Sequence, residues 1–177
     1  MRYLISIISI TFLLSEEIKT TTEKYLLDQF PNNISFKMHS IELDNKIIKL
    51  AQNKAKQKFH RDKIYYWNII QADSTIAFAF LDNVIGKSMP ITFMVILGIN
   101  GEIINTTIIK YREAYGGEIK HTGWLAQFNN RNNQSSYKVG KDIDGITGAT
   151  ISVNSISKGI HKIIILYPLI KNQLINE

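Results

Sequence analysis

The spacing of apolar residues changes along the first sixty positions, and each change predicts a new element. Apolar residues three or four positions apart predict a helix over Glu16–Phe30, which Pro31 ends. Strict alternation of apolar and polar residues then predicts a strand over Ile34–Leu43. Helical spacing returns from Asp44, a residue suited to capping a helix, and continues to about Phe59.

The middle of the chain consists almost entirely of strand-forming residues. β-branched and aromatic side chains dominate Ile64–Ile70, Thr75–Leu81, Ile91–Leu97 and Glu102–Tyr111. Asn100-Gly101 separates the last two runs, and this dipeptide between strands is the strongest short signal for a hairpin. The four runs together predict an antiparallel meander.

Helical spacing appears again in the last third of the chain. A short helix is expected from about Thr122 to Phe128, followed by a short strand at Tyr137–Val139. A longer amphipathic helix then continues to about Tyr167, where Pro168 is expected to interrupt it. The predicted fold class is α+β: a single domain in which helices pack on one antiparallel sheet.

Composition excludes several kinds of chemistry. The chain of 177 residues has no cysteine, so disulfides, thiolate metal sites and iron–sulfur clusters are ruled out. Its four histidines are not spaced as metal ligands, and we predict neither a metal site nor a catalytic residue. The net charge is +6, and lysines are concentrated in the helix expected from Asp44 to about Phe59. We interpret these lysines as a solvated face and not as a nucleic-acid surface.

The first fifteen residues have the pattern of a targeting segment. Arg2 precedes an apolar run from Tyr3 to Leu14, which is shorter than the ~20 residues needed to span a bilayer. We therefore predict a signal peptide or N-terminal targeting segment over residues 1–15 and a single domain over residues 16–177. The alternative is that this run forms a buried element of the fold.

A short loop ahead of the last helix carries the most specific sequence in the chain, Asp144-Gly-Ile-Thr-Gly-Ala-Thr-Ile-Ser152. Glycines allow a backbone to turn tightly and approach a ligand, and hydroxyl groups can donate to a phosphate. The free N–H groups of a helix N-terminus attract the same kind of anion. The candidate binding residues here are Gly145, Ile146, Thr147, Gly148, Ala149, Thr150 and Ser152.

This string resembles the flavinylation motif of the FMN-binding domain family, which includes the C and G subunits of the sodium-pumping quinone reductase and Rnf complexes. The family motif is (Ser/Thr)-Gly-Ala-Thr-x-(Ser/Thr), and Thr147 to Ser152 match it position by position. The resemblance implies that Thr150 carries FMN through a phosphoester bond. It also implies that a Mg-dependent flavin transferase attaches the FMN, with FAD as the donor.

A second loop, upstream of the motif, supports the resemblance. The hairpin at Asn100-Gly101 is similar to that of the family, and its second strand leads into Glu113 and a loop containing Gly116 and Gly117. The family usually has Thr or Ser after the acidic residue, where this chain has alanine. By resemblance, this loop lies beside the flavin, and Trp124 is a candidate to pack against the ring. Without a flavin, the glycine pair is a turn and the tryptophan a core residue.

The resemblance implies an exported electron-transfer flavoprotein that is not a stand-alone enzyme. Its expected partners are the flavin transferase and unidentified, membrane-bound redox partners. Its expected location is the periplasm or the outer face of the cytoplasmic membrane. The alternative is a flavin-free interaction module of the cell envelope, or one that binds a phosphate-bearing ligand without a covalent bond.

Overall fold

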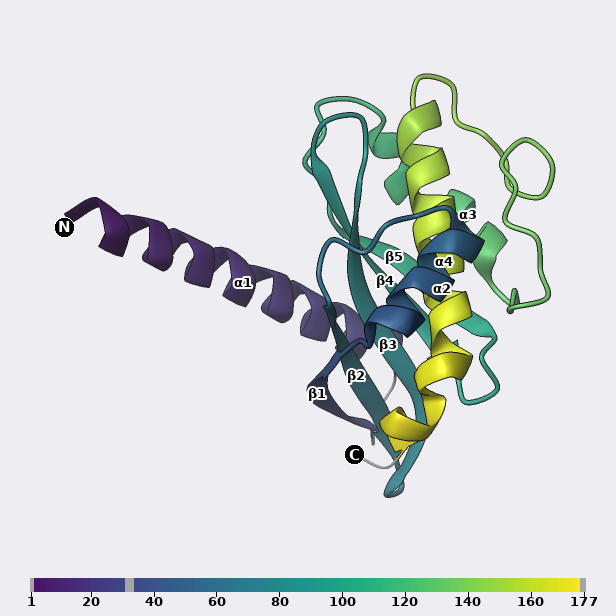
Figure 1. Cartoon of the computed structure of the whole chain (residues 1–177), viewed down its shortest axis with the longest axis horizontal. Helices are drawn as coiled ribbons and strands as arrows, with labels where there is room; N and C mark the ends of the chain where they lie inside the picture. The colour runs from purple at the N-terminus through teal and green to yellow at the C-terminus, as the bar shows by residue number, and fades with distance from the viewer. Residues whose placement is uncertain (1, 31–33, 176–177) are drawn as a thin grey trace.

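The computed structural model describes residues 2–30 and 34–175, with side chains described from Glu16 onward. Five strands and several helices follow one another along the chain (Figure 1). In order they are α1 (Arg2–Gln29), β1 (Ile34–Glu42), α2 (Asn45–Ala55), β2 (Lys63–Gln71), β3 (Ser74–Ile85), β4 (Pro90–Gly98), β5 (Ile103–Lys110), the 3₁₀ helix η1 (Gly117–Lys120), α3 (Thr122–Leu125), η2 (Ala126–Phe128) and α4 (Thr150–Ile175).

The strands form the predicted antiparallel meander, in the order β1-β2-β3-β4-β5. Tight turns join the central strands. Ala72 and Asp73 both have positive φ between β2 and β3, as a two-residue hairpin turn requires, and Gly101 has a φ of 85° between β4 and β5. The α+β fold class and the hairpin at Asn100-Gly101 are therefore confirmed.

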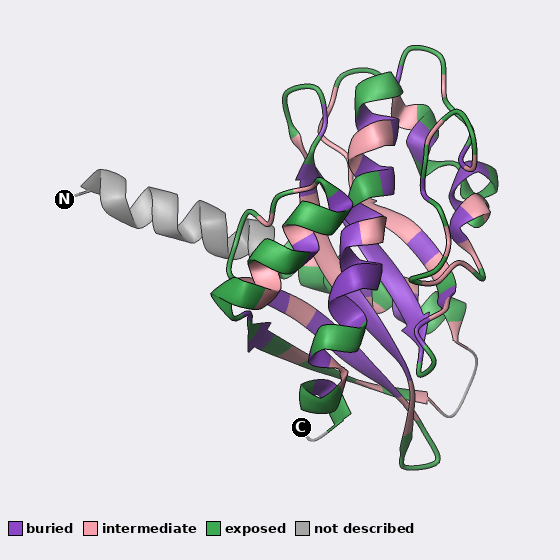
Figure 2. Cartoon of the chain, turned by 45° about the vertical axis from the view of Figure 1, so that its right-hand side comes forward, coloured by how far each residue is buried: buried purple, intermediate pink, exposed green. Residues whose placement is uncertain are grey.

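The two faces of the sheet bury different sets of residues because side chains alternate along each strand. On one face Phe80 and Phe93 pack with residues of α4 in the main core, against which Ile47 and Ile48 of α2 pack. On the other face Trp67 and Met94 form a smaller cluster with Leu26 of α1. Figure 2 shows α2 and α4 side by side over the first face, with buried residues along the strands beneath them.

Several predicted boundaries were wrong. The helix α1 is continuous from Arg2, instead of beginning at Glu16, and α2 ends at Ala55, because Lys56 adopts a left-handed conformation. Tyr137–Val139 contributes only an isolated bridge from Val139 to Ile143. None of the helices in the described part is long and apolar enough to cross a membrane. The prediction of a targeting segment over residues 1–15 stays a prediction.

The last helix was also predicted to stop too early, because Pro168 lies inside α4. A proline within a helix removes one backbone hydrogen bond and clashes with the preceding turn. The helix continues to Ile175 because Ile170 and Leu174, both 1% exposed, pack in the main core after the proline. Burial of these side chains outweighs the local cost.

Candidate functional site

The candidate site begins where the glycine-bearing loop becomes α4. Ala149 N–H donates to Ile146 O at 3.0 Å, and Gly148 has a φ of 81°, which favours glycine. Ala149 O then accepts from Val153 N–H at 2.9 Å as the first bond of the helix. The N–H groups of the first helical turn, from Thr150 onward, therefore lack acceptors within the helix.

The three hydroxyls of the motif differ in their access to solvent. Thr147 and Thr150 are exposed, whereas Ser152 is only 5% exposed. Ala149 is 4% exposed and belongs to the main core, so its side chain attaches the motif to that core. The helix start thus presents the Thr150 side chain to the outside and keeps that of Ser152 inside.

The upstream loop reaches the motif at one of its two glycines. Gly116 has a φ of 78°, and a Cβ added there would lie 3.0 Å from Ala149 Cβ. The Tyr111 hydroxyl donates to Tyr115 O and holds the loop in this shape. A Cβ at Gly117 would meet only Lys120 Cε, at 3.6 Å. The structure therefore brings Gly116 into contact with the motif, whereas Gly117 has no such contact with the motif.

Glu113 binds a third loop, the one that follows β3, close to the motif. Its carboxylate accepts from the N–H groups of Ser88 and Met89 at 2.7 and 3.0 Å, and these bonds lower the pKa of Glu113. A Cβ at Gly86 would lie 2.6 Å from Glu113 Oε1 and 3.2 Å from Ser152 Oγ. The loop after β3, the exit of β5 and the start of α4 therefore converge, and a fixed negative charge lies among them.

Trp124 holds the beginning of the motif in place. Its indole N–H donates to Asp144 O at 2.8 Å, and its ring packs edge-on against Phe128, with centroids 5.4 Å apart. Trp124 is 8% exposed. This geometry gives the ring a structural role beneath the motif. Its predicted contact with a cofactor stays a prediction.

The sequence analysis missed Arg131, which fastens the segment leading to the motif. Its guanidinium donates to three backbone carbonyls, those of Gln127, Ser136 and Asp142, at 2.6 to 2.8 Å. Gln127 in turn accepts from Asp144 N–H through its side chain at 2.8 Å. A single arginine in an Asn-rich stretch gave no pattern from which these partners were predictable.

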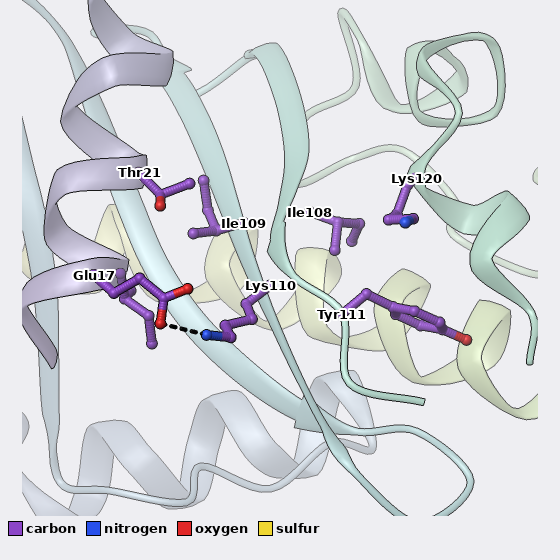
Figure 3. Close-up of a pocket in the computed structure, with 8 residues that line it drawn as sticks. Glu17, Thr21, Ile108, Ile109, Lys110, Tyr111 and Lys120 are labelled. Atoms are coloured by element: carbon purple, nitrogen blue, oxygen red, sulfur yellow. Dashed lines mark hydrogen bonds and ion pairs between the residues drawn. The ribbon is translucent and has the colours of Figure 1, made fainter. Parts of the chain in front are cut away.

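The motif is largely exposed, since six of its nine residues, 144–152, are exposed. Two cavities of about 370 and 580 Å³ lie elsewhere in the described structure, and neither is lined by a residue of 144–152. Figure 3 shows the smaller cavity, where Glu17 of α1 pairs with Lys110 of β5. The motif and the Gly116 loop each carry an exposed apolar side chain, because Ile151 is 52% exposed and Tyr115 is 85% exposed. No group of acidic or histidine side chains suited to a metal ion occurs among the described residues.

A protein-family model matches part of the chain. The family model of the FMN-binding domain matches residues 86–165, which span β4, β5, both loops and the first sixteen residues of α4. No curated protein matches the chain. The matched segment contains every predicted site residue, from Glu113 to Ser152, and indicates flavin binding. From Gly86 to Ile165, the chain therefore matches the FMN-binding domain family, which confirms the resemblance carried by the motif at Thr150.

Proposed function

We propose that this protein carries FMN on Thr150 through a phosphoester bond and transfers electrons between redox partners outside the cytoplasm. One observation carries the proposal: an exposed threonine hydroxyl stands at the first position of α4, inside the segment that matches the FMN-binding domain. The family motif has its attachment residue at this position.

The start of α4 offers what a phosphoryl group requires. Its first N–H groups lack helical acceptors, and the helix dipole places partial positive charge there. Thr150 and Thr147 both present hydroxyls at this surface, whereas Ser152 is buried. Among the three, Thr150 alone combines exposure with a place in the first turn of the helix. The residues present therefore fit a phosphate-linked cofactor.

Attachment is a group transfer that balances without a redox step. Thr150 Oγ forms a bond to the flavin-side phosphorus of FAD, the pyrophosphate P–O bond breaks, AMP leaves, and the threonine proton is released. A Mg-dependent flavin transferase is the proposed catalyst. This chain contributes the nucleophilic oxygen and the N–H groups that surround the new phosphoester.

The surroundings of Thr150 favour an electron carrier over a stand-alone catalyst. When bound, FMN supplies a ring that takes up and releases one or two electrons. Tyr115 and Ile151 offer exposed apolar surface against which a ring can lie, and Glu113 places a negative charge nearby. The open surface leaves a ring edge accessible to a partner protein. A covalent tether also prevents loss of the cofactor outside the cytoplasm, which agrees with the targeting pattern of residues 1–15.

Intact mass tests the proposal directly. We expect the full chain, co-expressed with a flavin transferase and denatured, to gain the mass of FMN minus water. Thr150→Val should abolish this gain, because valine lacks the nucleophilic oxygen. Thr122→Val is the matched control, since Thr122 is also exposed but lies outside the motif, and the added mass should stay in place.

Two results would contradict the covalent assignment. Retention of the added mass in Thr150→Val would place the bond on another residue. An unmodified mass in the parent chain, with a transferase that modifies a known acceptor in the same cells, would favour the alternative of a flavin-free or non-covalent phosphate-binding module of the cell envelope.

A further inference from the structure

We propose that the larger cavity, between α1 and the sheet, binds a small anionic amphiphile: one carboxylate or phosphate head group joined to an apolar body. The cavity has a volume of about 580 Å³, within the range of small-molecule sites. It lies on the face of the sheet opposite α2 and α4, and no residue of the motif lines it. The proposal therefore does not depend on flavin attachment.

The apolar part of the site is formed by strands β2 and β3. Tyr65, Trp67 and Leu81 line the cavity, and all three point to the face that α1 covers. Met38 and Ile85 extend this lining and are 38% and 42% exposed. Met38 lies opposite Trp67 in the register of β1 and β2, so an exposed and a buried apolar side chain adjoin here. Such a surface favours an apolar ligand body over water.

Arg112 supplies the candidate head-group contact. Its Nη1 donates to Pro90 O and to Thr92 Oγ1, both at 3.0 Å, and the Thr92 hydroxyl donates to Asn83 Oδ1 at 2.7 Å. These bonds fix the position of the guanidinium through one nitrogen and leave donors on its other two. No carboxylate pairs with Arg112 in the part of the chain that the structure describes. A charged, positioned and incompletely used guanidinium is suited to an anionic head.

The charges around the cavity favour the same ligand. Lys19 and Arg61 are exposed lining residues, whereas Lys63 pairs with Glu42 at 3.5 Å. The acidic lining residues are Glu16 and Asp82, and Asp82 is already paired with the buried Lys162 at 2.7 Å. Cations without an acidic partner therefore outnumber free carboxylates, which gives the opening a positive potential.

The smaller cavity shows the contrast. There Lys110 Nζ lies 2.5 Å from Glu17, so this lysine is paired within the chain, and the second lysine of the lining, Lys120, lies over the Tyr111 ring at 6.0 Å (Figure 3). In the larger cavity, a fully polar anion would leave the apolar lining uncovered, and a neutral lipid would leave the remaining donors of Arg112 without an acceptor. A molecule with an anionic head and an apolar tail satisfies both parts at once.

Tryptophan fluorescence can report binding, because the chain has two tryptophans and one of them lines the cavity. Trp124→Phe leaves Trp67 as the sole reporter in an otherwise full-length chain. We expect dodecanoate, titrated below its micelle concentration, to change the Trp67 emission saturably with one-to-one stoichiometry. Dodecyl phosphate, titrated in parallel, distinguishes a carboxylate head from a phosphate head. Neutral dodecan-1-ol should bind at least ~10-fold more weakly, since it lacks the charge-assisted bond.

Substitutions separate the head-group contact from general hydrophobic binding. Arg112→Gln should weaken binding by ~10-fold or more, and Arg61→Gln at the exposed rim by ~2- to 3-fold. Lys49→Gln, on α2 over the opposite face, is the charge-matched control and should leave the affinity unchanged. If Arg112→Gln fails to fold, as judged by circular dichroism, Arg61→Gln and Lys19→Gln carry the test instead.

Three outcomes would overturn the proposal. The first is the absence of saturable binding of both dodecanoate and dodecyl phosphate to the reporter chain. The second is equal affinity for dodecan-1-ol. The third is unchanged affinity in every folded variant that removes a cation from the cavity.

Discussion

The two faces of the sheet are covered to very different extents. Behind α4, side chains such as Phe93 and Ile163 are at most 1% exposed and belong to one large core that extends into the flavin motif. Behind α1, a smaller cluster surrounds Leu26, and residues of α1 line both cavities. Dense packing therefore lies under the candidate site, and looser packing lies on the face where the two cavities are.

The two faces also differ in their relation to the family match. β4, β5, the loops around Gly116 and most of α4 lie within residues 86–165, and they supply every residue of the candidate site. The helix α1, which covers the other face, lies outside that range. The candidate flavin site therefore lies within the matched segment, whereas the proposed amphiphile site requires α1.

Truncation of a core side chain on each face should give the largest difference. Ile163→Ala removes a fully buried side chain and should lower the free energy of unfolding by about 2–5 kcal/mol. Leu81→Ala, on a partly exposed residue that already borders a cavity, should cost only about 1 kcal/mol. Urea denaturation measures both values, and equal losses would show that the α1 face is packed as tightly as the other.

A smaller effect is expected where the upstream loop meets the motif. Gly116→Ala introduces a side chain at a φ of 78° and 3.0 Å from Ala149 Cβ, so it should cost about 1–2 kcal/mol and reduce the flavinylated fraction. Gly117→Ala, with its nearest contact at 3.6 Å, is the matched control and should stay within about 0.5 kcal/mol. Denaturation and intact mass give the two readouts. Identical flavinylation in both variants would remove Gly116 from the site.

The smallest effect concerns pH. Burial lowers the pKa of His161, which stacks on Tyr137 with ring centroids 4.6 Å apart. Below a pH of about 6.5, His161 therefore binds a proton more readily in the unfolded chain than in the folded chain. The free energy of unfolding decreases as the pH falls through this range. His161→Gln should flatten this dependence in urea titrations between pH 8 and 5. An unchanged slope in the variant would assign the loss to other groups.

The sequence predicted features that depend on near neighbours. Strand-forming composition and the Asn100-Gly101 turn identified the central strands, and the glycine-bearing string was expected directly before the last helix. In the structure, α4 begins within that string, at Thr150. Long-range contacts were not predictable in this way. Glu113 was expected beside a flavin, but its bonds to Ser88 and Met89, on a loop more than twenty residues earlier, could not be inferred from spacing. The predicted interruption of the last helix at Pro168 was wrong for the same reason, because the burial of Ile170 and Leu174 after the proline decides whether the helix continues.

The meander order has a consequence for the way the molecule is assembled. Each strand pairs with its neighbour in the sequence, so closing each loop costs little conformational entropy. The sheet can therefore form progressively from its N-terminal end. Thr150 follows all five strands, and its surroundings are complete only when α4 docks on the finished sheet. We therefore expect a chain that emerges N-terminus first to become a substrate for flavin attachment only at the end of folding, so that the modification marks a finished domain.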